Sequence, residues 1–80
     1  MAKNVIVYST AMCPYCSMEK EWLKKNGIKF KDINVGEDRK AAQEMILKSG
    51  QSGVPVTDID GKIVVGFNKE ELKKLLGIKE

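Results

Sequence analysis

The order of elements in the first half of the chain restricts its fold more than any other feature. Residues 4–9 (NVIVYS) are β-branched and aromatic, as in a buried strand. Residues 14–27 carry helix signals, and residues 28–35 (IKFKDINV) alternate apolar and polar side chains. A strand, a helix and a second strand in this order form parallel neighbours joined by a right-handed crossover. An α/β fold is therefore predicted.

The second half of the chain adds a helix and a hairpin to this unit. Residues 36–50 predict a helix with acidic side chains in its first turn and Lys48 in its last. Two apolar runs, residues 54–59 and 62–67, flank the dipeptide Asp-Gly at positions 60–61, which is the strongest short hairpin signal. The hairpin adds an antiparallel pair of strands to the sheet.

The C-terminal residues 68–80 predict a third helix. Asn68 with Glu71 three residues later is typical of a capping box, and an apolar stripe begins at Leu72. The predicted order is β-α-β-α-β-β-α, a mixed four-stranded sheet with three helices. We find no repeat or linker, so residues 1–80 are predicted to form a single domain.

Composition indicates a small soluble protein without a nucleic-acid or membrane role. The 14 Lys and Arg exceed the 11 Asp and Glu only slightly, and the lysines are spread along the chain. The sequence has no cluster of basic residues of the kind that binds nucleic acid. No apolar run approaches the roughly 18 residues of a membrane span, and the N-terminal run is too short for a signal peptide. We expect a cytoplasmic monomer, with some preference for anionic partners.

The chain has two cysteines, and both lie in the CPYC stretch that joins the first strand to the first helix. Cys13 is predicted at the helix N-cap. Pro14 then occupies the first helical position, where the backbone N–H that proline lacks would have had no partner. The free amides around Tyr15 and Cys16 and the positive end of the helix then favour a thiolate at Cys13. Cys16 lies just under one turn further on and is more shielded. Cys13 is therefore the predicted nucleophile, and Cys16 is the thiol that resolves the mixed disulfide.

Other uses of two cysteines are less compatible with this chain. A self-contained zinc site needs about four ligands, and the chain has no histidine. A permanent disulfide would close a very short loop, where stabilisation by loop entropy is least. An iron–sulfur cluster shared between two chains stays open as an alternative. The pattern favours a redox-active dithiol.

Residues 53–56 (GVPV) carry the second feature of a redox site. Pro55 stands at the start of a predicted strand, since a proline in mid-sheet would be costly. In a βαβ redox fold we expect its peptide bond to be cis and to face the sulfurs. The Val54 backbone would then offer its N–H and C=O groups to an extended ligand. An ordinary trans proline at a strand entry is the alternative.

Together the CPYC pair, the VPV segment and a Gly-led turn before the last helix resemble the glutaredoxin family, from about Lys3 to Leu76. The resemblance implies a thioredoxin-like fold and a glutathione-dependent thiol–disulfide oxidoreductase. It implies no bound cofactor, with glutathione or a similar low-molecular thiol as co-substrate. Disulfides of client proteins would be its other substrates.

The resemblance also implies a set of binding residues. Tyr15 would lie beside the bound thiol, and Val54, before the proline, would pair with the glutathione backbone. The turn before the last helix would hold the γ-glutamyl end. The complete set of residues assigned to glutathione or peptide binding is Tyr15, Gln51, Val54, Pro55, Gly66, Phe67 and Asn68.

A position before the cysteines and the last turn both depart from the family pattern. Many glutaredoxins have a lysine three residues before the first cysteine, where this chain has Thr10. The last turn (GFNKEEL) lacks the paired glycines and resembles NrdH-type redoxins. Such a redoxin is reduced by thioredoxin reductase and donates electrons to ribonucleotide reductase, so this is the alternative function. A dimeric iron–sulfur module, with Cys13 and glutathione from each of two copies, is the alternative of another class.

Glu19 follows Cys16 by three residues, where relatives usually have a small apolar side chain. We expect a partly exposed carboxylate that faces a lysine. The alternative is a buried carboxylate near the sulfurs. It could exchange a proton with Cys16, or raise the pKa of both thiols by repulsion.

Overall fold

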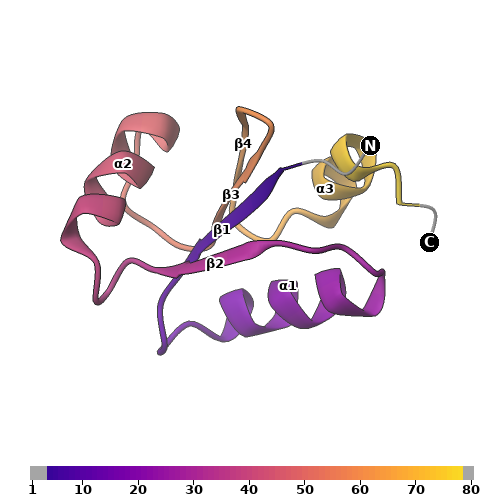
Figure 1. Ribbon diagram of the computed structural model, residues 1–80, viewed down its shortest axis with the longest axis horizontal. Coiled ribbons are helices and arrows are strands. Elements are labelled where there is room, and N and C mark those ends of the chain that lie inside the picture. The colour runs from indigo at the N-terminus through magenta and orange to yellow at the C-terminus, as the bar shows by residue number, and fades with distance from the viewer. Residues whose placement is uncertain (1–3, 79–80) are drawn as a thin grey trace.

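The computed structural model describes residues 4–78 and confirms the predicted order of elements. Two βα units come first, followed by a hairpin and a last helix (Figure 1). The bounds are β1 Val5–Ser9, α1 Pro14–Lys25, β2 Lys31–Asn34, α2 Arg39–Ser49, β3 Val56–Ile59, β4 Lys62–Val65 and α3 Lys69–Leu76.

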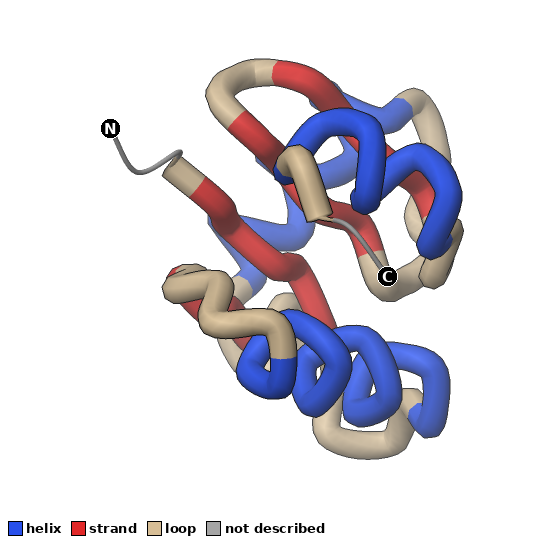
Figure 2. The backbone as a smooth tube through the Cα atoms, turned by 90° about the vertical axis from the view of Figure 1, so that its right-hand side faces the viewer, coloured by secondary structure: helices blue, strands red, loops and turns tan. Residues whose placement is uncertain are grey.

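The four strands form one mixed sheet in the order β2-β1-β3-β4. β1 runs parallel to β2, as the βαβ order requires, and antiparallel to β3, which pairs antiparallel with β4. Figure 2 shows the strands in red among the helices in blue. The mixed sheet with three helices is the predicted thioredoxin-like architecture.

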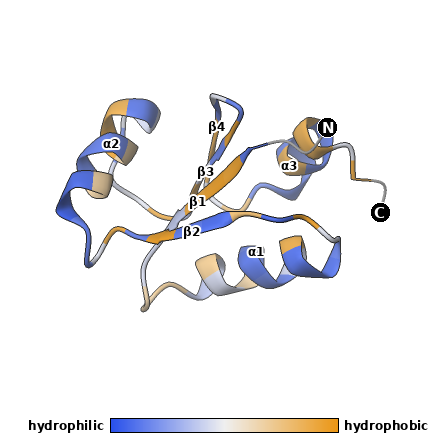
Figure 3. Cartoon of the chain, viewed as in Figure 1, coloured by the Kyte–Doolittle hydropathy of each residue, from blue (hydrophilic) through white to orange (hydrophobic). Residues whose placement is uncertain are grey.

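Helices cover both faces of the sheet, and each face has its own apolar cluster. On one face α1 and α3 pack on the sheet, and on the other face α2 does so. In Figure 3 the central strand β1 is hydrophobic, while α1 is largely hydrophilic outside its buried face. The buried members of the first cluster are Val5, Val7, Trp22, Leu23, Ile59, Val64 and Leu72, and those of the second are Tyr8, Ala41, Met45 and Val56.

The start of α2 differs from the prediction. The helix begins at Arg39 and not at residue 36, and its first turn holds no acidic side chain. Asp38 is the N-cap, and its carboxylate accepts a hydrogen bond of 3.0 Å from the Ala41 amide. The acidic residues therefore precede the helix, and the Asp38 carboxylate caps its N-terminus. Asp is a preferred residue at N-cap positions.

The strands are also shorter than predicted. β2 pairs only over Lys31–Asn34, while Ile28 and Phe30 stay outside the ladder and pack against the first cluster. At the β3–β4 turn both Asp60 and Gly61 have positive φ, 51° and 91°, which confirms the tight hairpin.

The last helix confirms one half of the predicted capping box. Asn68 is the N-cap, and its side-chain oxygen accepts from the Glu71 amide at 3.2 Å. The Asn68 amide donates to the Gly66 carbonyl and not to Glu71, so the reciprocal half is wrong. The helix ends at Leu76, and the predicted residues 79–80 lie outside the described residues.

A partly buried polar cluster that sequence reasoning missed ties α2 to the sheet. The Lys48 ammonium donates to the Tyr8 hydroxyl at 2.8 Å and to the Asp58 carboxylate at 2.9 Å. These bonds raise the pKa of Lys48 above its ordinary value. Strand alternation places Tyr8 and Asp58 on the α2 face, so the pattern could have indicated their partner. Within residues 4–78, no helix has the length and apolar character needed to span a membrane.

Candidate active site

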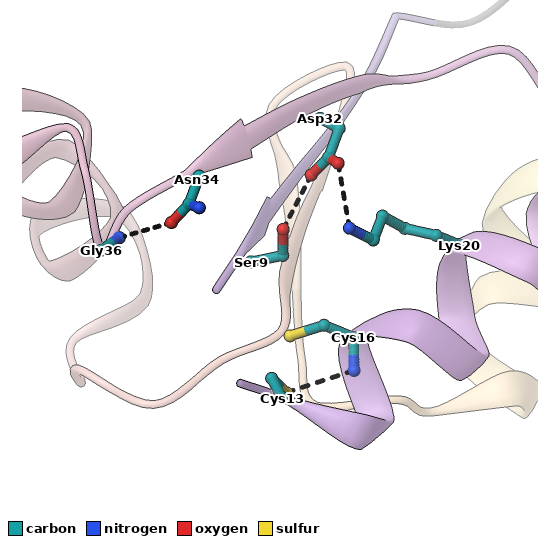
Figure 4. Close-up of polar contacts among 7 residues, drawn as sticks. All are labelled: Ser9, Cys13, Cys16, Lys20, Asp32, Asn34 and Gly36. Atoms are coloured by element: carbon teal, nitrogen blue, oxygen red, sulfur yellow. Dashed lines mark hydrogen bonds and ion pairs between the residues drawn. The ribbon is translucent and has the colours of Figure 1, made fainter. Parts of the chain in front are cut away.

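The two cysteines occupy the predicted positions at the start of α1. Cys13 is the N-cap with extended backbone, and the Cys16 amide donates to its sulfur at 3.2 Å (Figure 4). Cys13 is half-buried, whereas Cys16 is 0% exposed. The helix end thus presents one reachable sulfur, supported by an amide, with a second sulfur shielded behind it.

The surroundings of Cys16 keep its thiol protonated. Burial first, and then the hydrogen bond with Cys13, raise the pKa of Cys16 to about 12. A hydrogen bond from the Thr10 backbone acts in the opposite direction, and the charge of Glu19 raises the pKa further. Thr10, which replaces the lysine of many relatives, therefore contributes to the site through its backbone.

The Val54–Pro55 segment lies directly against Cys13. The peptide bond between the two residues is cis, which confirms the expected geometry. The Cys13 thiol donates to the Val54 carbonyl, with 3.8 Å between sulfur and oxygen. Within residues 4–78 the Val54 amide donates to no acceptor, so it can bind a ligand. Pro55 is buried, and its carbonyl accepts from the Gly66 amide at 2.8 Å.

The Gly-led turn before α3 is therefore joined to the cysteine site through Pro55. Gly66 has a φ of 77°, a conformation that favours glycine. The Phe67 ring contacts Trp22 of α1 edge-on, with 5.9 Å between ring centroids, which also fixes the turn against α1. Gly66 and Phe67 are half-buried, and Asn68 is exposed.

The remaining predicted binding residues differ in what they can offer. Tyr15 is 63% exposed next to the cysteines, so its ring is available to a ligand. The Gln51 amide is engaged within its own loop: it donates to the Gly53 carbonyl at 2.9 Å and accepts from the Gly53 amide at 2.7 Å. Gln51 thus shapes the loop that leads to Val54. Its role in binding, like that of the other residues, stays a prediction.

The expected exposed position of Glu19 is wrong. Its side chain is 0% exposed, and one carboxylate oxygen accepts a hydrogen bond from the Thr57 hydroxyl of β3. The other oxygen, Oε1, has no hydrogen-bond partner among the described residues. Burial raises the pKa of Glu19 to about 7, against the opposing effect of the Thr57 hydrogen bond. The side chain points inward because its helix position lies on the face that packs on the sheet.

A polar network above the cysteines was not predicted. Asp32 of β2 accepts from the Ser9 hydroxyl at 2.7 Å and from the Lys20 ammonium at 2.9 Å (Figure 4). Burial raises the pKa of Asp32, but these two hydrogen bonds and the charges of Lys20 and Lys24 together outweigh it and hold the pKa below its ordinary value. Asp32 is therefore an ionised, fully partnered carboxylate that joins β1, β2 and α1.

The described residues contain no group of three or more His, Cys, Asp or Glu side chains that could hold a metal ion. The two cysteines form a dithiol at a helix N-terminus beside a cis proline. In this α/β fold, the arrangement defines a thioredoxin-like redox domain.

Comparison with known proteins gives the family. The glutaredoxin family model matches residues 5–64. An uncharacterized glutaredoxin-like 8.6 kDa protein in the rubredoxin operon of Clostridium pasteurianum is 54% identical, over 88% of this chain and 93% of that protein. The glutaredoxin-like protein NrdH of Lactococcus lactis subsp. cremoris is 37% identical, over 89% of this chain and 97% of its own length. The chain belongs to the glutaredoxin family.

Solved structures agree with this assignment. The crystal structure of a glutaredoxin from Archaeoglobus fulgidus superposes with a TM-score of 0.83 at 33% identity, covering 91% of this chain and 85% of that chain. The chain is thus an oxidoreductase of the glutaredoxin and NrdH group of thiol redoxins.

Proposed function

We propose that the protein reduces disulfides and glutathione mixed disulfides through Cys13 and Cys16. The observation that carries this proposal is the asymmetry of the pair. The Cys13 sulfur is accessible and accepts a helix amide, while Cys16 is buried with a raised pKa. One sulfur can therefore meet a substrate, and the other can react only with its neighbour.

The reaction has two steps. The Cys13 thiolate attacks a substrate disulfide R–S–S–R′, forms a mixed disulfide with R, and releases R′ as a thiolate. Cys16 then loses its proton and attacks the Cys13 sulfur, which releases R as a second thiolate. The substrate gains two electrons, and the two cysteines become a disulfide that a reductant must reopen.

Glutathione is the proposed reductant. The Val54 amide is available beside Cys13, the Tyr15 ring is exposed two residues after Cys13, and the turn at Gly66 is joined to the same segment. These features support the binding of a short extended thiol along Val54. A dithiol used in this way needs a compartment that keeps thiols reduced, so the proposal includes a cytoplasmic location.

One observation favours thioredoxin reductase as the alternative reductant. The first turn of α3 contains Glu70 and Glu71, whose charges already complement the helix dipole. The γ-glutamyl end of glutathione carries an ammonium and a carboxylate, and its carboxylate would meet two negative charges at this end of α3. The similarity to the Lactococcus NrdH supports the same alternative, in which the site serves protein partners.

A paired assay tests the proposal. The oxidised chain is incubated with glutathione, glutathione reductase and NADPH, or with thioredoxin reductase and NADPH, and reduction of hydroxyethyl disulfide is followed. Turnover with glutathione supports the proposed reductant, and turnover only with thioredoxin reductase supports the alternative.

The roles of the two sulfurs are tested separately by single substitutions. Cys13→Ser should abolish reduction of every disulfide, since it removes the attacking sulfur. Cys16→Ser should keep activity on glutathione mixed disulfides, because free glutathione can attack at Cys13 instead. Equal loss of that activity in both variants would contradict the assigned roles.

A further inference from the structure

Glu19 is a buried carboxylate that the proposed reaction does not yet use. It follows Cys16 by three residues on α1, and both residues are 0% exposed. Its hydrogen-bond donor, Thr57, pairs with Val7 and Val64 on the neighbouring strands, so an aliphatic surface surrounds the contact. Most buried polar atoms have partners, so an unpartnered Oε1 in such surroundings calls for a functional explanation.

The resolving step creates a need for an internal proton acceptor. Cys16 must lose its proton to attack, yet its side chain is sealed from solvent and its pKa is raised to about 12. Two of the causes of that pKa involve the Cys13 thiol, and they end once Cys13 is in a mixed disulfide. Burial and the charge of Glu19 remain, so the proton still needs an acceptor inside the protein.

Other charged groups near the sulfurs are engaged elsewhere. Asp32 of β2 accepts from Ser9 and Lys20. Asp58 of β3 binds Lys48 on the opposite face of the sheet. Thr10 acts on Cys16 only through its backbone.

Glu19 fits the requirement. Its pKa of about 7 lets it exist both with and without a proton near neutral pH. Helix residues three apart have Cβ atoms about 5–6 Å from each other. The charge of Glu19 acts on Cys16, so the two side chains are close enough to interact. We expect rotation of the Glu19 side chain, or one intervening water, to connect Oε1 with the Cys16 sulfur.

We propose that Glu19 accepts the Cys16 proton in the resolving step and returns it when the disulfide is reopened. This inference rests on the proposed function. The proton passes from the Cys16 sulfur to the Glu19 carboxylate, and the sulfur's electron pair forms the bond to Cys13. The bond between Cys13 and R breaks, and R leaves as a thiolate with that bond's electron pair. Glu19, now neutral, later gives the proton back to Cys16 or to solvent.

The two steps can be separated with Ellman's reagent, 5,5′-dithiobis(2-nitrobenzoic acid), on the reduced full chain by stopped flow. Attack by Cys13 releases one thionitrobenzoate in a phase that depends on reagent concentration. Resolution by Cys16 releases a second in a first-order phase. We expect the first-order rate of the wild-type chain to rise with pH, with a midpoint near 7.

Glu19→Gln should slow the first-order phase by at least about tenfold at pH 8 and remove its midpoint. The concentration-dependent phase should stay within about twofold. Thr57→Val should shift the midpoint to higher pH, because it removes the hydrogen bond that lowers the pKa of Glu19. Glu21→Gln, an exposed position on the same helix, is the matched control and should behave as wild type.

An unchanged or faster first-order phase in Glu19→Gln would overturn the inference. Glu19 would then affect Cys16 only by raising its pKa through charge repulsion. A midpoint that Thr57→Val leaves in place would overturn it too, and this variant still decides the question if Gln at position 19 disturbs folding. Release of only one thionitrobenzoate by the wild-type chain would instead refute the resolving role of Cys16 in the proposed function.

Discussion

Replacing Glu19 by Gln should change how the stability of the fold depends on pH. The pKa of Glu19 rises from an ordinary 4.5 to about 7 in the folded chain, mainly through burial. Between these two values the folded chain binds a proton at Glu19 that the unfolded chain has released. The free energy of unfolding therefore falls as pH rises through this window.

The size of the effect follows from the two pKa values. The interval between 4.5 and about 7, at roughly 1.4 kcal/mol for each pH unit, corresponds to about 3 kcal/mol. The destabilisation is absent below pH 4.5 and complete above about pH 7. No histidine titrates in this window, because the chain has none, and the lowered pKa of Asp32 acts below it.

Urea unfolding of the reduced chain measures this effect. Trp22 is the single tryptophan and is buried, so its fluorescence follows unfolding. Gln keeps the shape of Glu and an oxygen that can accept from Thr57, but carries no charge. Relative to wild type, Glu19→Gln should therefore gain about 3 kcal/mol between pH 4.5 and 8. Glu21→Gln should follow wild type within about 0.5 kcal/mol. Parallel curves for wild type and Glu19→Gln would refute the reasoning.

Two further predictions concern elements around the site. Lys48→Met should lower the free energy of unfolding by about 1–3 kcal/mol, because it leaves the buried Asp58 carboxylate and the Tyr8 hydroxyl without their donor. The control is Lys40→Met, at an exposed position of the same helix. Equal urea midpoints for the two variants would contradict the role of the cluster. Asn68→Ala should cost about 1 kcal/mol, since it removes the N-cap of α3, while Asn68→Asp should retain the cap; thermal unfolding that ranks the two variants equally would count against this assignment.

Local patterns predicted most of the fold. The strand, helix and strand of the first half, together with the Asp60-Gly61 turn, depend on neighbouring residues and a general rule of handedness. The position of Cys13 at the helix N-cap likewise follows from Pro14 and its immediate surroundings. The cis bond before Pro55 was expected from the βαβ redox fold, since the local sequence also allowed a trans proline at a strand entry.

Long-range contacts were harder to predict. The donor to Glu19, Thr57, is 38 positions away, and the spacing along α1 allowed Glu19 to share the face of Cys16 but did not indicate this partner. Ser9 and Asp32 are likewise 23 positions apart. The first pair is set by the packing of α1 on the sheet and the second by the pairing of β1 with β2, and local propensity sets neither. The start of α2 was misplaced because an acidic residue suits both an N-cap and a first turn.

Because the two cysteines differ in accessibility, the number of cysteines that react with a thiol reagent reports whether the chain is folded. In the native chain, an alkylating reagent such as iodoacetamide should modify Cys13, which is half-buried, and not Cys16, which is 0% exposed. Denaturation uncovers both. Intact mass after a short labelling pulse therefore counts native and unfolded molecules directly, one adduct against two, without any engineered residue.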